Sequence, residues 1–187
     1  GKTYARFRLS TDVAAANPTG SASDGEVEDY TATIVERNGG TVASTIRIGD
    51  RLNGWVPNGL DAGDFFGHAV TSLGDLNGDG IPDLVVGAYR DEVNDSNEGA
   101  LWTLFMNSAG TVNSHVKISD GAGGFTGSLE ASAQFGISVA SMGDLNGDGV
   151  PDLAVGANQH ETGDLSEGAV FILFMQNDGT VASHADR

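Results

Sequence analysis

Cysteine is absent from the 187 residues, which excludes disulfides, zinc–thiolate sites and a cysteine nucleophile. Basic residues are few: 9 Lys and Arg stand against 26 Asp and Glu, and the formal net charge is -17. A chain this acidic repels nucleic acid and anionic lipid, so we expect it to bind neither. No stretch approaches the ~20 apolar residues of a membrane span, and we therefore expect no membrane insertion.

Glycine, in contrast, is abundant. The chain has 28 glycines among 187 residues, roughly twice the average share. Because 39% of the residues are hydrophobic, the composition indicates a globular chain with many turns and not a disordered one. No segment keeps a helical 3.6-residue period over three turns, so we expect an all-β fold.

A repeat organises most of the chain. Residues 66–115 and 135–184 align without a gap at an offset of 69 residues, and 30 of the 50 aligned positions are identical. Turn residues divide each copy into four short segments rich in Val, Leu and Phe, as expected for strands. Four short antiparallel strands, repeated, are typical of β-propeller blades. We expect these strands near 67–73, 83–88, 99–106 and 111–118, and near 136–142, 152–157, 168–175 and 180–184.

A third, partial copy lies upstream. Residues 38–48 read NGGTVASTIRI and match residues 108–118, which read SAGTVNSHVKI. We therefore expect 38–50 to be an orphan blade strand, the fourth strand of a blade whose first three strands are missing. The predicted organisation is a short N-terminal β segment over 1–37, the orphan strand and a connection over 38–65, the first blade over 66–118, and a connection with the second blade over 119–187.

Each copy carries the motif D-L-N-G-D-G-[IV]-P-D between its first two strands. Oxygen donors recur at positions 1, 3, 5 and 9, and the glycines at positions 4 and 6 permit the positive φ of a tight curl. The backbone carbonyl at position 7 adds a further oxygen. The candidate ligands are Asp75, Asn77, Asp79, Ile81 and Asp83 in the first copy and Asp144, Asn146, Asp148, Val150 and Asp152 in the second.

A shell of oxygens alone suits Ca²⁺, whereas Mg²⁺ prefers a rigid octahedron that keeps several waters. The alternative is that the Asn-Gly and Asp-Gly pairs only form hairpin turns. A two-residue turn needs one such pair, however, and three carboxylates in one loop would repel each other without a cation. We therefore predict one Ca²⁺ per loop, about two per chain, with the position-9 Asp able to bind through both oxygens. The loop begins like an EF-hand loop but has no Glu at position 12.

The pattern FG…GD-x-[ND]-G-D-G-x-x-D-L-x-V-G-A…GA resembles the FG-GAP repeat of integrin α chains and of many bacterial surface proteins. Phe66–Gly67 and Phe135–Gly136 match its FG, and Gly87–Ala88 and Gly156–Ala157 match its later Gly-Ala. The resemblance implies four-stranded propeller blades with Ca²⁺ in the hairpin between the first two strands. Residues 5–34 resemble the end of the GEVED domain, a β-sandwich module of bacterial secreted proteins, through Gly25–Tyr30.

Several other polar residues are weaker candidates. A second acidic loop could complete a cation shell, bind a neighbouring chain or lie in solvent, and Glu26, Glu28 and Asp29 could likewise contact a cation or be solvated. The histidines form no pattern typical of a triad, and we interpret them as surface or strand residues. Trp102 and Phe171 are expected to pack within the blades. The acidic loop holds Glu92, Asp95 and Glu98, equivalent to Glu161, Asp164 and Glu167, and the histidines are His68, His115, His160 and His184.

Because no nucleophile–base pair stands out, we predict no catalytic residue and no enzyme activity. Three functions remain: a calcium-binding extracellular module for protein interaction or adhesion, a subunit that self-assembles through blade edges into rings or filaments, and a non-catalytic accessory domain of a larger secreted enzyme. The expected partner is another protein or a further copy of the chain; carbohydrate could also bind, although no motif supports it. Extracellular calcium sites are too weak to fill in the cytosol, so we expect a secreted or cell-surface protein.

Overall fold

The structure is a computed structural model that describes residues 5–8, 27–30, 42, 44–53, 55, 57–92, 97–161 and 167–186. The chain divides into two compact units, Gly1–Thr45 and Ile46–Arg187. In the first unit β1 (Ala5–Arg8) pairs antiparallel with β2 (Val27–Tyr30). The expected N-terminal β segment is therefore present.

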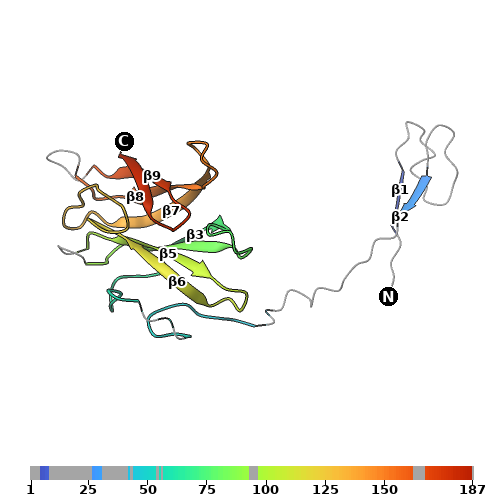
Figure 1. The fold of residues 1–187 in the computed structure, drawn as a ribbon, viewed down its shortest axis with the longest axis horizontal. Helices are drawn as coiled ribbons and strands as arrows, with labels where there is room; N and C mark the ends of the chain where they lie inside the picture. The colour runs from blue at the N-terminus through green and yellow to red at the C-terminus, as the bar shows by residue number, and fades with distance from the viewer. Residues whose placement is uncertain are drawn as a thin grey trace. The chain divides into compact units, whose positions relative to one another are not determined.

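The second unit contains two four-stranded antiparallel sheets, one for each repeat (Figure 1). Each sheet runs in chain order, which is the arrangement of a β-propeller blade. The all-β prediction is confirmed, and every bound of the eight predicted strands lies within two residues of the observed one. The first blade consists of β3 (Ala69–Gly74), β4 (Asp83–Ala88), β5 (Ala100–Met106) and β6 (Val112–Ile118). The second consists of β7 (Phe135–Gly143), β8 (Asp152–Ala157), β9 (Ala169–Met175) and β10 (Val181–Asp186).

The orphan strand predicted over 38–50 does not form in the part of it that the structure describes. Residues 44–48 have no regular secondary structure and a turn begins at 49, while residues 38–41 and 43 lie outside the described residues. Both sheets are already complete with four strands from their own repeat. A fourth-strand sequence needs the edge of a third strand to pair with, and neither blade leaves one for it.

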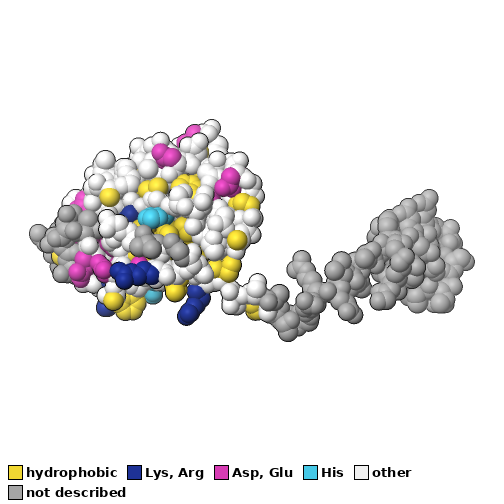
Figure 2. Space-filling model, turned by 60° about the horizontal axis from the view of Figure 1, so that its bottom comes forward, with side chains coloured by type: hydrophobic (Ala, Val, Ile, Leu, Met, Phe, Trp, Pro, Cys, Tyr) yellow, Lys and Arg dark blue, Asp and Glu magenta, His cyan; other side chains and the backbone are white. Residues whose placement is uncertain are grey.

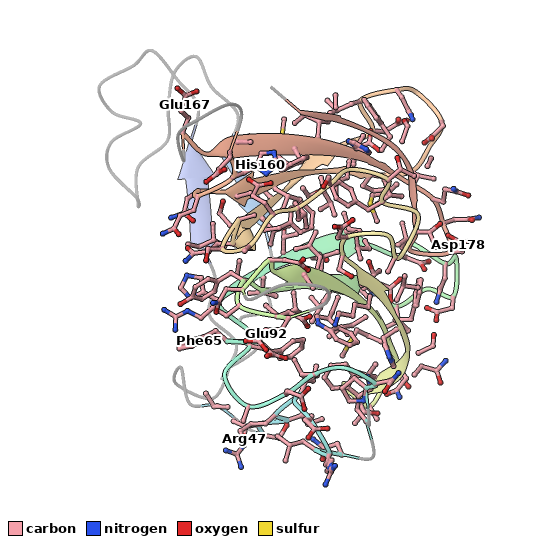
Figure 3. All side chains as sticks on the ribbon, turned by 90° about the vertical axis from the view of Figure 1, so that its left-hand side faces the viewer. Arg47, Phe65, Glu92, His160, Glu167 and Asp178 are labelled. Carbon is pink, nitrogen blue, oxygen red and sulfur yellow. The ribbon has the colours of Figure 1, made fainter. Side chains whose placement is uncertain are left out.

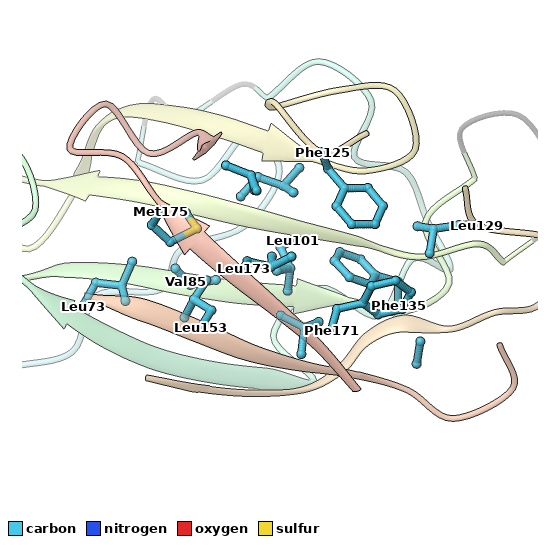
Figure 4. Packing of buried hydrophobic residues seen from close by; sticks show 14 of the residues in the cluster. Leu73, Val85, Leu101, Phe125, Leu129, Phe135, Leu153, Phe171, Leu173 and Met175 are labelled. Carbon is cyan, nitrogen blue, oxygen red and sulfur yellow. The ribbon is translucent and has the colours of Figure 1, made fainter. Parts of the chain in front are cut away.

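The main core lies between the two blades (Figure 4). Val85 and Leu101 of the first blade pack against the cluster that holds Leu153 and Leu173 of the second, and all four are fully buried. These side chains alternate with residues on the opposite face of each strand, as the two-residue period of a strand requires. Among the described residues, the structure has no helix that could cross a membrane.

Each blade also receives an aromatic side chain from the segment that precedes it. Trp55 lies edge-on to Trp102, with ring centroids 6.0 Å apart, and Phe125 lies edge-on to Phe171 at 5.6 Å. Trp102 and Phe171 are buried, so they do pack within the blades as predicted. The connecting segments thus repeat their role, and Trp55 and Phe125 follow equivalent glycines, Gly54 and Gly124, in the sequence.

Glycines of the repeat motif set the approach of the two blades. A Cβ atom on Gly87 would lie 2.0 Å from the carbonyl oxygen of Gly136, and one on Gly99 would lie 2.2 Å from that of Phe135. Two backbones can come this close only where a residue carries no side chain. The FG and Gly-Ala elements therefore meet at the boundary between blades.

Candidate metal centre

The loop between β3 and β4 is curled by hydrogen bonds from its own amides. Asp75 accepts three N–H groups: Gly78 (2.8 Å) and Asp79 (2.9 Å) donate to Oδ1, and Gly80 (2.8 Å) donates to Oδ2. Asn77 Oδ1 accepts from the same Asp79 amide at 2.9 Å. The positive φ angles of Gly78 (80°) and Gly80 (88°) allow this curl. Oxygens from positions 1 and 3 of the motif therefore surround one amide.

Position 5 joins the same network. Asp79 Oδ1 accepts the Ile81 amide at 2.8 Å, and Oδ2 accepts from Asn77 Nδ2 at 3.1 Å. The side chains of Asp75, Asn77 and Asp79 are exposed at this end of the blade. The sequence prediction that alternate side chains of the loop gather on one small region is thus met for positions 1, 3 and 5.

The loop between β7 and β8 reproduces this geometry. Asp144 accepts the amides of Gly147 (2.7 Å), Asp148 (3.1 Å) and Gly149 (2.9 Å). These N–H groups, with that of Gly149 as the largest contribution, hold the pKa of the Asp144 carboxyl below its usual range. Asp144 therefore stays ionised, the form that binds cations, to lower pH than an ordinary aspartate.

The aspartates at position 9 have a role that the motif did not reveal. Asp83 is fully buried, and its two oxygens accept the amides of Leu76 (3.0 Å) and Met106 (2.9 Å). Asp152 does the same with Leu145 (2.8 Å) and Met175 (3.0 Å). Each carboxylate thus ties the loop to the third strand of its blade. Binding of Ca²⁺ by these residues stays a prediction.

The donor set fits a hard cation, although the described residues contain no group of three or more His, Asp and Glu side chains placed to hold a metal ion. Each loop brings two carboxylates and one amide oxygen to its exposed side, and the third carboxylate points at buried amides. Carboxylates that bind metals are themselves held by hydrogen bonds, so the amide network does not compete with a ligand role. The chemistry of the loop agrees with Ca²⁺, and its occupancy stays a prediction.

The two loops border a common hollow of about 330 Å³. Asp75 and Asn77 line it from the first loop, Asp148 and Val150 line it from the second, and Asn177 lies in the β9–β10 hairpin. Two acidic loops thus lie beside one another at the same end of the blades. Their charges add, which favours cations near this end.

The second acidic loop of the first blade is not simply solvated. Glu98 is buried, while Glu92 is exposed. The Phe135 amide of the second blade donates to the Glu98 carbonyl oxygen at 2.8 Å. This loop therefore contacts a neighbouring blade. Asp95 and Asp164, and the side chains of Glu26, Glu28 and Asp29, lie outside the described residues.

One histidine departs from the predicted surface position. His160 is buried, with Nδ1 2.9 Å from Glu130 Oε1, and its ring lies edge-on to Phe171 at 5.0 Å. His115 accepts a hydrogen bond from Trp55 Nε1 at 3.0 Å, and burial lowers the pKa of its ring. These contacts are structural, and they come from the connecting segments, whose positions the repeat pattern did not predict.

The first blade also contains an ion pair that the sequence pattern did not predict. Asp91 is buried, and Lys117 Nζ lies 2.6 Å from its Oδ1. Lys117 also donates to the Gly59 carbonyl at 2.9 Å and lies over the Trp102 ring, 5.3 Å from its centroid. Burial raises the pKa of the Asp91 carboxyl, and Lys117 opposes that rise. The second blade has His160 and Asp186 at the two equivalent positions. The ion pair therefore does not recur in the repeat, and comparison of the two copies could not predict it.

Comparison with known proteins identifies the repeats. Residues 66–104 and 135–173 match the sequence profile of the FG-GAP repeat. The chain contains two FG-GAP repeats. It is 44% identical over 110 residues to integrin alpha-3 of Cricetulus griseus, 36% identical over 130 residues to integrin alpha-4 of Xenopus laevis, and 37% identical over 119 residues to the phosphatidylinositol-glycan-specific phospholipase D of Bos taurus.

These matches cover 58%, 69% and 63% of this chain but only 10%, 11% and 14% of the three relatives. The chain therefore spans about a tenth of the length of the proteins it resembles. The FG-GAP repeats explain why both sheets are propeller blades. The resemblance of residues 5–34 to a GEVED domain, and with it the implied likeness to bacterial secreted proteins, stays a prediction.

Proposed function

We propose that this chain is a calcium-stabilised extracellular or cell-surface module for protein interaction, with one Ca²⁺ in each loop between the first two strands of a blade. The observation that carries the proposal is the repetition of the same oxygen geometry, hydrogen bond for hydrogen bond, in Asp75–Asp83 and Asp144–Asp152. A plain hairpin turn needs no such set of carboxylates.

The loop amides would support a bound ion by orienting its ligands. The N–H groups around Asp75 and Asp144 already hold these carboxylates in fixed positions, so less side-chain freedom is lost when a cation binds. The exposed oxygens of Asp75, Asn77 and Asp79 and the Ile81 carbonyl would supply the protein part of the shell, and water would supply the rest. Two bound ions would change the formal charge from -17 to -13.

The proposal is tested by counting metal and measuring stability. Extracellular calcium modules bind with Kd of about 10⁻⁴–10⁻³ M, and binding to the native state alone adds about 2.7 kcal/mol when calcium is a hundredfold above Kd. Equilibrium dialysis of the whole chain should give about two ions per molecule. Asp79→Ala and Asp148→Ala should each remove about one ion, because each deletes a charged oxygen ligand of one loop.

Asp178→Asn is the matched control. Asp178 is an exposed aspartate whose Oδ1 accepts the amide (3.0 Å) and the hydroxyl (2.6 Å) of Thr180, and it lies in a hairpin without the motif. Its replacement should leave the metal count at about two. An unchanged melting temperature between excess chelator and saturating calcium would refute calcium binding.

The role in protein interaction rests on the integrin alpha chains among the relatives, and it is a proposal for this chain. A non-catalytic accessory role beside an enzyme is the second candidate, and the similarity to a phospholipase D favours it. The two are separated by pull-down from an extracellular protein mixture, with calcium and with chelator. Calcium-dependent capture of a separate protein, lost in Asp79→Ala, supports the first role. Capture that is identical in chelator contradicts the link between calcium and binding.

A further inference from the structure

The sequence has only two lysines, Lys2 and Lys117, and the amine of Lys117 lies against a buried carboxylate. Lys117 Nζ is 2.6 Å from Asp91 Oδ1, and the two side chains are 20% and 1% exposed. The ion pair between Arg51 and Asp50 lies in water by comparison, with side chains 82% and 42% exposed. Figure 2 likewise shows basic side chains beside acidic ones on the surface of the second unit. The Lys117–Asp91 pair is therefore a different kind of contact from a surface salt bridge.

The Asp91 carboxylate depends on this one contact. Apart from Lys117, neither of its oxygens has a hydrogen-bond partner among the described residues, whereas the equally buried Asp83 accepts two backbone amides. Burial raises the pKa of the Asp91 carboxyl, and Lys117 opposes that rise. Two charges buried with so few hydrogen bonds are costly to the fold. A neutral product at the same place would remove that cost.

Both groups are held in place by further contacts. Lys117 Nζ donates to the Gly59 carbonyl at 2.9 Å and lies 5.3 Å from the centroid of the Trp102 ring. The backbone of Asp91 is fixed as well, because its carbonyl accepts the Gly99 amide at 3.0 Å. The amine is thus kept in contact with the carboxyl group of Asp91. Groups held in this way can react as if at an effective concentration of about 10⁵–10⁸ M.

We propose that Lys117 and Asp91 condense into an amide, so that a covalent bond joins β6 to the loop that follows β4. Lys117 first transfers a proton to the Asp91 carboxylate, which converts the ion pair into a neutral amine and a carboxylic acid. Nζ then attacks Cγ, the N–C bond forms, and the bond from Cγ to the hydroxyl oxygen breaks. Of the three ammonium protons, one stays on the amide nitrogen and two leave with that oxygen as water. The step needs no oxidant, reductant or further reactant.

A second buried carboxyl is available to carry protons during this step. Asp64 is buried, and it lines a hollow of about 330 Å³ together with Gly59, whose carbonyl contacts Lys117 Nζ. The residues that follow Asp64 and Asp91 in the chain, Phe65 and Glu92, line the same hollow and lie near each other in Figure 3. Burial raises the pKa of the Asp64 carboxyl, so it stays protonated to higher pH than an ordinary aspartate. It can therefore relay a proton from Nζ to the leaving oxygen.

The second blade offers an internal comparison, because it lacks both reacting groups. Its equivalents of Asp91 and Lys117 are His160 and Asp186, and Nδ1 of His160 lies 2.9 Å from Glu130 Oε1. The bond is thus specific to the first blade, where β6 is the last strand of the sheet and β5 separates it from β4. An amide between residues 91 and 117 closes a loop around β5, and it constrains the unfolded chain as a disulfide would.

This inference goes beyond the calcium-binding function and is tested separately, at constant saturating calcium. The whole chain is recovered unfolded in urea and refolded by dilution, and its intact mass is measured in denaturant over days. The mass of the refolded chain should fall by one molecule of water. A sample kept in urea should retain its full mass, because only the fold holds the amine against the carboxyl group.

The two lysines supply a matched pair of variants. Lys117→Arg keeps a positive charge beside Asp91, but a guanidinium that stays protonated is no nucleophile, so this variant should retain its full mass. Lys2→Arg should lose water as the wild type does. Asp64→Asn should slow the loss of water by about a hundredfold if Asp64 relays the proton.

Protease digestion locates the bond. Trypsin should no longer cut after Lys117, because the side chain of an amide-bonded lysine carries no charge. A protease that cuts after Glu92 should then leave two segments that remain joined, and their mass should equal the sum of the two segments less one water.

Three results would overturn the proposal. The first is a refolded wild-type chain that keeps its full mass, which would show that the pair stays ionic. The second is a loss of water that persists in Lys117→Arg, which would assign it to a succinimide at an Asp-Gly bond such as Asp79–Gly80. The third is tryptic cleavage after Lys117 in chains that have lost water. An unchanged rate in Asp64→Asn would remove Asp64 from the mechanism.

Discussion

Gly87 and Gly156 occupy the same position of the two repeats, yet we expect alanine to be costly at only one of them. A Cβ on Gly87 would lie 2.0 Å from the carbonyl oxygen of Gly136 in the other blade. Non-bonded heavy atoms pack best at a separation of about 3.5 Å. The second blade would therefore have to move away from the first by about 1.5 Å. A gap of that order forfeits much of the dispersion energy between the blades.

At Gly156 the obstacle is a side chain. An added Cβ would lie 2.3 Å from Ser138 Oγ, and rotation of the serine removes that contact without moving a backbone. Neither glycine has a positive φ. Alanine therefore restricts the unfolded chain equally at both sites and favours folding by about 0.4–1 kcal/mol.

The difference between the two variants isolates the contact between the blades. Overpacking of a core costs about 1–3 kcal/mol and occasionally more. We expect Gly87→Ala to lower the free energy of unfolding by about 3 kcal/mol, and Gly156→Ala to change it by less than about 1 kcal/mol. For a unit of this size, 3 kcal/mol corresponds to a melting temperature lower by about 6–12 °C.

Calorimetry of the chain at constant calcium measures both variants. Equal melting temperatures for Gly87→Ala and Gly156→Ala would refute the reasoning, because the two sites would then not differ in what surrounds them.

Three further predictions concern buried and capped charges. Lys117→Met should lower the free energy of unfolding by about 3–5 kcal/mol at neutral pH, since it leaves the buried Asp91 carboxylate without its partner. Because burial raises the pKa of the Asp91 carboxyl, this loss of stability should shrink as the pH falls and Asp91 is protonated. Urea titrations in which the loss grows toward acid pH would contradict this. Asp83→Asn should lower the free energy of unfolding by about 2 kcal/mol, because an oxygen that accepts a buried backbone N–H is replaced by an NH₂ group that donates. Asp79→Asn, at an exposed position, should lower it by less in calcium-free buffer. Equal losses would argue against the anchoring role of Asp83. Because the pKa of the Asp144 carboxyl is lowered in the fold, its ionised form stabilises the fold above the ordinary aspartate pKa, and this contribution is lost as the pH falls through the lower folded-state value. Asp144→Asn should therefore flatten the acid side of the plot of unfolding free energy against pH in calcium-free buffer. An unchanged plot would exclude that contribution.

The strands and the curled acidic loops could be predicted from the sequence for local reasons. A strand is marked by its two-residue period and by Gly, Asn and Asp in its turns, and β4 and β8 have the predicted bounds. The loop donors follow from alternate positions around two glycines, so Asp75, Asn77 and Asp79 gather where the spacing places them. The two copies of the repeat show the same strands and the same loop curl.

The remaining features depend on which segments come to lie beside each other, and a local pattern does not carry that information. Asp83 and Asp79 are aspartates of one motif, but only Asp83 is buried, because β5 brings the Met106 amide to it. His160 is buried because Glu130 and Phe171 come to lie beside it. The segment 38–50 matches a fourth strand, but in the part of the chain that the structure describes the third strands β5 and β9 are already paired with β6 and β10. By itself the sequence determined two blades with oxygen-rich loops. Only the tertiary structure decided which of two equivalent residues is buried: Leu101 lies in the core between the blades, whereas Val170, 69 positions later, is exposed.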